Sequence, residues 1–283
     1  FFGANSTTPF ENPTVLTNIV EMIAMMILPG ACVVTFGHMI HDKKKAQESA
    51  PKKRLLMGRQ GAVLFGAMSI LFLVGLLICF NAESAGNPVI SDLGISQDAG
   101  SMEGKEVRFG VAQSSLFTTV TTSFTTGTVN NMHDTLTPLG GMVPMLHMML
   151  NCVFGGKGVG LMIEGKEMKL VAIVILIHPL LILGFSALAV AIPDGLAAIT
   201  NPGYHGLSQV LYEYASSAAN NGSGFEGLAD NTVFWNVTTG LAMFFGRYIA
   251  IVAQLAIAGS LLAKRKVNET IGTLRTDNVT FMI

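Results

Sequence analysis

A short, threonine-rich apolar stretch near the middle of the chain, SSLFTTVTTSFTTGTVNNMHD (Ser114 to Asp134), constrains the fold most. Its apolar part has about a dozen residues, whereas a helix needs roughly 20 residues to cross a hydrocarbon core of about 30 Å. The chain must therefore turn back, at Thr125-Thr126-Gly127. Backbone outside a helix survives at membrane depth only inside protein or beside a water-filled cavity. A re-entrant helix that ends in small residues with free carbonyls is how a cation filter is built.

The composition also places the chain in a membrane. Hydrophobic residues make up 50% of it and charged residues only 12%, well below the roughly 25% charge of soluble domains. The cysteines lie in apolar stretches without metal-like spacing, so neither a disulfide framework nor a zinc site is predicted. The net charge of −1 gives no reason to expect a nucleic-acid partner. Long apolar runs predict spanning helices at about 14–40, 60–80, 139–163, 169–193 and 233–263.

The basic residues give the expected orientation. The segment from Lys43 to Arg59 is rich in lysine and arginine, whereas the segment from Asn81 to Glu103 carries only acidic charges. Cytoplasmic loops are enriched in basic residues, so we place the first segment inside. Counting helices then puts the basic cluster at 264–266 on the cytoplasmic side of the membrane and the loop at 194–201 on the outer side. This count requires that both short segments are re-entrant, one between the second and third runs and the other between the fourth and fifth runs.

The same unit recurs along the chain, and repeats are strong signs of architecture. A spanning helix, an acidic outer loop, a re-entrant helix, a glycine-bearing turn and a second spanning helix occur at about 60–163 and again at about 169–263. A partial copy opens the chain, because the segment 10–18 shares a Phe-Glu pair and a Thr-Val-x-x-Asn step with the segment 225–236. We therefore expect the chain to begin just beyond a turn like those at Gly127 and Gly222.

Seven dispersed segments carry a resemblance to a known family. They are FFGANSTTPFENP (1–13), MEGKEVRFG (102–110), LGGMVPM (139–145), EGKEMKL (164–170), NPGYHG (201–206), SSAANNGSGFEGL (216–228) and AIAGSL (256–261). The sequence resembles the KdpA family, the A chains of bacterial potassium-transporting ATPases, within the superfamily of potassium transporters. The resemblance covers nearly the whole chain.

The resemblance implies an all-α membrane protein made of repeated units, each with a spanning helix, a re-entrant pore helix with its filter loop, and a second spanning helix, as in a potassium channel. It implies a potassium-binding and translocating subunit of an ATP-driven, high-affinity uptake complex in the bacterial inner membrane. K+ is then the transported ion, no organic cofactor is expected, and the subunit itself hydrolyses nothing. The implied partners are the P-type ATP-hydrolysing subunit KdpB, KdpC, the small KdpF and the lipid bilayer. A stand-alone potassium channel or an ion-gradient-driven transporter is the alternative.

Several departures from the family pattern predict a portion of a longer subunit that would not form a selective pore by itself. The family's first unit and the filter before Phe1 are absent, residues are missing after Gly160, and the final helix expected after Phe281 is absent. We divide the chain into the end of one pore unit (1–40), a basic cytoplasmic loop (41–59), a pore unit shortened near 160 (60–163), a complete pore unit (164–263) and a cytoplasmic segment (264–283).

The filter residues follow from the resemblance and from ion chemistry. Potassium sheds its water only if several carbonyl oxygens replace it, and glycine permits the dihedrals that point successive carbonyls one way. Thr-Thr-Gly by itself is equally explained by a small-residue helix contact. If both loops serve one ion, Gly127 and Gly222 should lie within about 15 Å of each other. The expected filter residues are Thr125, Thr126, Gly127 and Thr128 in one loop and Asn220, Asn221, Gly222 and Ser223 in the other, with Phe2, Gly3 and Asn5 at the exit of a third.

Two charged residues lie within the apolar runs. Arg247 is near the middle of the last run, where a lipid-exposed arginine costs roughly 2.5–3.5 kcal/mol, so we expect it to face protein or a cavity. The resemblance places it below the filter, where it would repel or guide cations, and a snorkelling or helix-pairing arginine is the alternative. Glu21 is either a structural hydrogen-bonding group or a group that attracts cations.

The segment FGGKGVG (154–160) has the look of a phosphate-binding loop. Lys157 is followed by glycine, however, and no strand-to-helix context exists, so a glycine-rich break within a span is the better interpretation. In the resembled family the corresponding helix is kinked and gates the pore, which gives Gly155, Gly156, Gly158 and Gly160 as gate residues. We expect a shortened, re-routed span or a chain break between Gly160 and Glu164.

Overall fold

A computed structural model describes residues 8–45, 58–151, 153–154 and 165–262, and every regular element within these ranges is a helix. The prediction of an all-α membrane protein is confirmed. The helices are α1 (Val15–Lys45), α2 (Gly58–Ser84), α3 (Pro88–Asp92), α4 (Gly110–Ser123), α5 (Pro138–Leu150), α6 (Gly165–Ala191), α7 (Pro193–Leu196), α8 (Gly203–Ala219) and α9 (Val233–Leu262).

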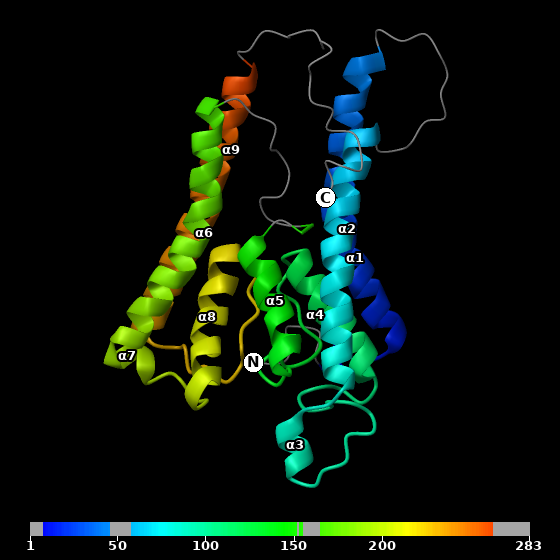
Figure 1. Cartoon of the computed structure of the whole chain (residues 1–283), viewed down its shortest axis with the longest axis vertical. Coiled ribbons are helices and arrows are strands. Elements are labelled where there is room, and N and C mark those ends of the chain that lie inside the picture. The colour runs from blue at the N-terminus through cyan, green and yellow to red at the C-terminus, as the bar shows by residue number, and fades with distance from the viewer. Residues whose placement is uncertain (1–7, 46–57, 152, 155–164, 263–283) are drawn as a thin grey trace.

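Four stretches within the described residues are long and apolar enough to cross a membrane: Val15–Gly37, Gly61–Asp92, Ala172–Ala191 and Val233–Ser260. Their outer faces expose large apolar side chains such as Leu176 and Leu255, which suits contact with lipid. In Figure 1, α3 and α7 lie at one end of the molecule, and the starts of α2 and α6 lie at the other. This arrangement agrees with the predicted sides of the loops. The assignment of one side to the cytoplasm stays a prediction.

The predicted span at 139–163 is wrong within the described residues. Helix α5 has only 13 residues and ends at Leu150, so it is too short to cross a bilayer at 1.5 Å per residue. It ends there because Asn151 adopts the left-handed conformation, with φ of 46°, and its N–H donates to the carbonyl of His147 at 2.9 Å. Hydropathy alone did not reveal this stop.

After α5 the chain turns back toward the end of α4. The N–H of Phe154 donates to the carbonyl of Ser123 at 3.1 Å, and the Phe154 ring stacks on Phe124 with centroids 4.8 Å apart. These rings join a buried cluster with Val33 of α1 and Met68 of α2. The predicted gate, Gly155, Gly156, Gly158 and Gly160, and the expected junction at 160–164 lie outside the described residues.

Helices α4 and α8 are short, with 14 and 17 residues, and are largely buried although α4 is rich in serine and threonine. In each case the chain enters and leaves on the same side. Ser101, before α4, and Thr137, after it, both bond to Glu83 at the end of α2. Ala229, after α8, donates its N–H to the carbonyl of Ala198, before it, at 2.9 Å. Both helices therefore turn back within the layer that the long helices define.

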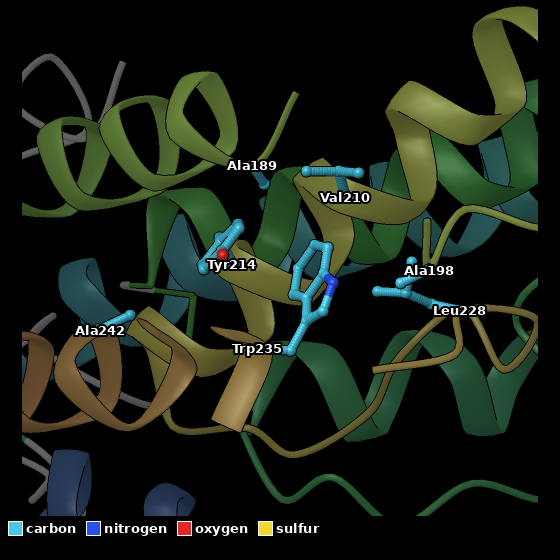
Figure 2. Packing of buried hydrophobic residues seen from close by; sticks show 7 residues of the cluster. All are labelled: Ala189, Ala198, Val210, Tyr214, Leu228, Trp235 and Ala242. Carbon is cyan, nitrogen blue, oxygen red and sulfur yellow. The ribbon is translucent and has the colours of Figure 1, made fainter. Parts of the chain in front are cut away.

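A buried apolar cluster holds α8 between α6 and α9 (Figure 2). Trp235 of α9 is fully buried and stacks on Tyr214 of α8, with ring centroids 5.3 Å apart, while Phe185 of α6 stacks on the same tyrosine at 5.6 Å. On the opposite side, α8 packs against α5. The second re-entrant helix is thus clamped between its own unit and the preceding one, which fixes the position of the loop that follows it.

Candidate functional site

The turns after α4 and α8 have the same backbone conformation. Thr125 and Asn220 both adopt positive φ, at 52° and 56°, and two residues later Gly127 and Gly222 do so again, at 84° and 97°. The residue between them closes the helix in the same way in each turn, because Thr126 N–H and Asn221 N–H each donate to the carbonyl five residues earlier at 3.0 Å. The repeat seen in the sequence is therefore a repeat of backbone geometry.

The two turns touch each other. The carbonyl of Asn221 lies so close to Gly127 that a Cβ atom on this glycine would collide with it, and the same Cβ position is 3.4 Å from the Cα of Gly222. The side chain of Asn221 crosses to the other unit, where its Nδ2 donates to the carbonyl of Thr121 at 3.1 Å. The expected proximity of Gly127 and Gly222 is confirmed. Ion binding by the loops stays a prediction.

The alternation of φ along each turn has a chemical consequence. Non-glycine residues rarely adopt positive φ, and such strain of about 1–3 kcal/mol concentrates at functional sites. Alternating the sign of φ turns successive carbonyls toward one side, which is the arrangement that replaces the water shell of a dehydrated cation. Thr128 and Ser223, the residues after the two glycines, extend the two turn segments. The turns can therefore offer backbone oxygens from two directions.

Helix α1 borders the first turn and is tied to it by amide side chains. Asn18 accepts from Asn12 at 2.9 Å and from Asn130 at 3.0 Å, and its own Nδ2 donates to Gln113 of α4 at 3.0 Å. Asn12, Asn18 and Asn130 are fully buried. Further along α1, the sulfur of Met25 accepts from the hydroxyl of Thr126 at 2.9 Å. The partial unit that opens the chain thus contacts both ends of α4.

A buried ion pair braces the outer end of the first unit. The Nζ of Lys105 lies 2.6 Å from Oε2 of Glu83, and both side chains are fully buried. The other carboxylate oxygen, Oε1, accepts from the N–H and the hydroxyl of Thr137 at 2.8 and 2.7 Å. A carboxylate at the start of a helix is favoured by the helix dipole, here that of α5. Three segments of the unit therefore converge on Glu83.

A second polar cluster joins the two units in the segments that follow the two turns. Glu226, just after the second turn, accepts the N–H groups of His133 and Asp134 at 3.2 and 3.0 Å. Asp134 accepts in turn from Asn201 at 3.1 Å and lies 3.3 Å from Nε2 of His205. These contacts hold the segment after the first turn against the segments on both sides of α8.

The two charged residues within the apolar runs, Arg247 and Glu21, lie in α9 and α1. Gly246 of α9 abuts the backbone of Ala218 at the end of α8, and Met243 accepts from Asn220 at 3.2 Å. Arg247, the next residue, is therefore at the level just past the second turn, and its side chain is exposed within the described structure. In α1, Oε2 of Glu21 is buried and has no hydrogen-bond partner among the described residues. Neither position tests the role predicted for it.

Two residues at the site were missed by the sequence reasoning. Tyr212 of α8 and His133 are fully buried and are joined by a hydrogen bond of 2.6 Å. They come from different repeats, and no local spacing in the sequence signals the contact. Phe2, Gly3 and Asn5, predicted at the exit of a third strand, lie outside the described residues.

Fold and site together define a class, that of multi-pass membrane proteins in which re-entrant helices meet at glycine-bearing turns. The profile of the family described as potassium-transporting ATPase A subunit, KdpA, matches residues 1–163 and 161–283. The chain belongs to this family.

A relative supports the same assignment. The potassium-transporting ATPase potassium-binding subunit of Geobacillus kaustophilus (strain HTA426) is 52% identical over 308 aligned positions, which cover 99% of this chain and 52% of the relative. The chain thus spans about half the length of that relative. The alignment is longer than the 283 residues of the chain, so the relative contains residues without a counterpart here. The two profile matches meet at 161–163, next to the predicted shortening.

Proposed function

We propose that this chain is part of a potassium-binding and translocating subunit of an ATP-driven, high-affinity potassium uptake complex. The observation that carries the proposal is the contact between the two turns, in which the same backbone conformation occurs twice and the carbonyl of Asn221 meets Gly127. The similarity to a protein named as a potassium-binding subunit supports K+ as the ion that is bound.

In this proposal, K+ is selected by backbone carbonyls of Thr125, Thr126, Gly127 and Thr128 and of Asn220, Asn221, Gly222 and Ser223. Further strands come from other pore units, one of which ends at Phe2, Gly3 and Asn5. Several carbonyls held at a fixed separation compensate the lost hydration of K+ better than that of a smaller ion. The chain would contribute the units at 60–163 and 164–263 and the end of another at 1–40.

The subunit would hydrolyse nothing itself and would depend on a P-type ATP-hydrolysing partner, KdpB, with KdpC and KdpF completing the complex in the bacterial inner membrane. The test is purification of the complete polypeptide from membranes, followed by a search for a co-purifying subunit that forms an aspartyl phosphate. We expect such a subunit, with K+ accelerating its dephosphorylation. Potassium flux into vesicles by the polypeptide alone, without ATP and without any such partner, would instead establish the alternative of a stand-alone channel or gradient-driven transporter.

A further inference from the structure

The hydroxyl of Tyr212 joins the two pore units behind the filter turns. It lies 2.6 Å from Nδ1 of His133, which follows the first turn, and 3.1 Å from Oγ of Ser223 in the second turn. Ser223 in turn bonds to the side chain of Asn221, whose Nδ2 reaches Thr121 of α4. A continuous path of hydrogen bonds therefore runs from the first unit into the second turn and back.

Two backbone groups fix the direction of this path. The carbonyl of Thr121 can only accept, so the atom of Asn221 that faces it must be the amide nitrogen. The N–H of Ser223 can only donate, at 3.0 Å, so the atom of Asn221 that it meets must be Oδ1. The Ser223 hydroxyl also donates to Oδ1 and has no second proton to give. It must then accept from Tyr212.

The same reasoning assigns the tautomer of His133. Because the hydroxyl proton of Tyr212 is directed to Ser223, the Tyr212 oxygen must accept from Nδ1–H of His133. His133 would then carry its proton on Nδ1 and leave Nε2 bare, and Nε2 is the buried ring atom without a hydrogen-bond partner among the described residues. Lys105 acts on this ring electrostatically, and Glu226 accepts from the backbone N–H of the same residue.

We propose that His133 and Tyr212 are positioning residues that orient the Asn221 carboxamide, and with it the second filter strand, against the first unit. This inference rests on the proposed potassium-binding function and adds a determinant of cation selectivity that lies outside the ion-lining residues. Without the Tyr212 hydroxyl, the Ser223 hydroxyl loses its donor and can turn from Asn221 Oδ1 to the sulfur of Met148, 3.9 Å away, so its hold on Asn221 weakens. The path holds Asn221 where its own carbonyl meets Gly127.

Tyr214 provides a matched control on the same helix. It is also fully buried and its hydroxyl also has a partner, Oγ1 of Thr238 on α9 at 2.8 Å. It belongs to the apolar cluster with Trp235 (Figure 2), and two positions along a helix place it about 200° around the axis from Tyr212. Tyr→Phe at either position removes one buried hydroxyl and preserves the ring, so a general effect on packing or on the stability of α8 should be similar for both.

The experiment is a titration of ATP hydrolysis by the complete complex in native membranes with K+, Rb+ and Na+, with the amount of subunit normalised by immunoblot. For Tyr212→Phe we expect the half-saturating K+ concentration to rise about three- to tenfold, the factor that one or two ordinary hydrogen bonds carry. The ratio of the Rb+ and K+ half-saturating concentrations should fall toward one, while the maximal rate changes less than twofold. Tyr214→Phe should leave both cation parameters unchanged.

A pair of histidine variants tests the direction of the path. The side-chain nitrogen of asparagine can take the place of Nδ1, so His133→Asn should shift the half-saturating K+ concentration less than His133→Leu, which has no donor. Equal cation parameters for Tyr212→Phe and Tyr214→Phe, or equal shifts for the two histidine variants, would overturn the positioning role. A wild-type complex without any dependence on K+ would instead overturn the proposed function on which the inference rests.

Discussion

The carbonyl oxygen of Asn221 occupies the space that a Cβ atom on Gly127 would need. Two independent constraints therefore require glycine at position 127. Its φ of 84° disfavours any side chain, and the partner turn fills the adjacent volume. Gly222, with φ of 97°, has open space around the corresponding position. The two turns repeat in backbone conformation, but only one of them carries the close contact.

The buried ion pair at the outer end of the first unit should dominate its stability. Replacing Lys105 by Met leaves the Glu83 carboxylate buried without its counter-charge, and removal of one partner of such a pair costs about 3–5 kcal/mol. The measurement is the apparent melting temperature of the detergent-solubilised protein. Glu106→Gln breaks the partly exposed pair between Glu106 and Arg108 and serves as the control, with an expected cost of about 0–1 kcal/mol. Equal shifts for both variants would refute the bracing role of Glu83.

Two glycines of α9 should respond in opposite directions to the same substitution. A Cβ on Gly246 would overlap the backbone of Ala218 in α8, whereas a Cβ on Gly240 meets nothing within 4 Å. We expect Gly246→Ala to destabilise the protein by about 1–3 kcal/mol through overpacking, and Gly240→Ala to stabilise it by roughly 0.5–1 kcal/mol through helix propensity. Thermal unfolding of both variants under the same conditions checks this. Tolerance of Gly246→Ala would mean that α8 and α9 are not in close contact.

The contribution of His133 to the stability of the protein should be lost on mild acidification. Burial, followed by the positive charge of Lys105, lowers the pKa of His133 from 6.5 to about 3. Between these two values the unfolded chain binds a proton that the folded protein does not, so stability is fully present above pH 6.5 and is lost as the pH falls below it. The loss amounts to about 2 kcal/mol at pH 5.

The measurement for this histidine is the apparent melting temperature at several values between pH 7.5 and pH 5, compared with that of His133→Asn. Glu226 has a raised pKa, caused mainly by burial, and acts in the opposite direction, since its contribution is lost as the pH rises. The difference between the two proteins isolates His133, because Glu226 is present in both. A pH dependence that persists unchanged in His133→Asn would contradict the assignment.

The sequence predicts the local geometry of the site well and its long-range contacts poorly. The glycines at 127 and 222 stand at the same place in two copies of one unit, so their conformations and proximity followed from the repeat. The end of α5 did not, because an apolar run continues past Leu150 while one left-handed residue, Asn151, ends the helix. Hydropathy is a sum over residues and is insensitive to a single dihedral angle.

The contacts between the units were out of reach for a different reason. Tyr212 and His133 lie in separate repeats, and a tyrosine in a helix with a histidine in a loop has no distinctive spacing. The buried pair of Lys105 and Glu83 likewise joins residues whose partners only the folded chain selects. Local periodicity therefore predicts the elements, and packing between them decides which polar groups meet.

The most direct test of the account is cation selectivity after Gly127→Asp in the complete complex. Aspartate adds a Cβ and a charge where φ is 84° and where the Asn221 carbonyl already lies, so strain of about 1–3 kcal/mol falls on the turns themselves. ATP hydrolysis is titrated with K+, Rb+ and Na+. The account predicts a higher half-saturating K+ concentration and weaker discrimination against Rb+ and Na+, with assembly with the ATP-hydrolysing partner retained. An unchanged half-saturating K+ concentration and an unchanged cation order would show that this turn is only a packing corner, and the filter assignment of Thr125 to Thr128 would have to be withdrawn.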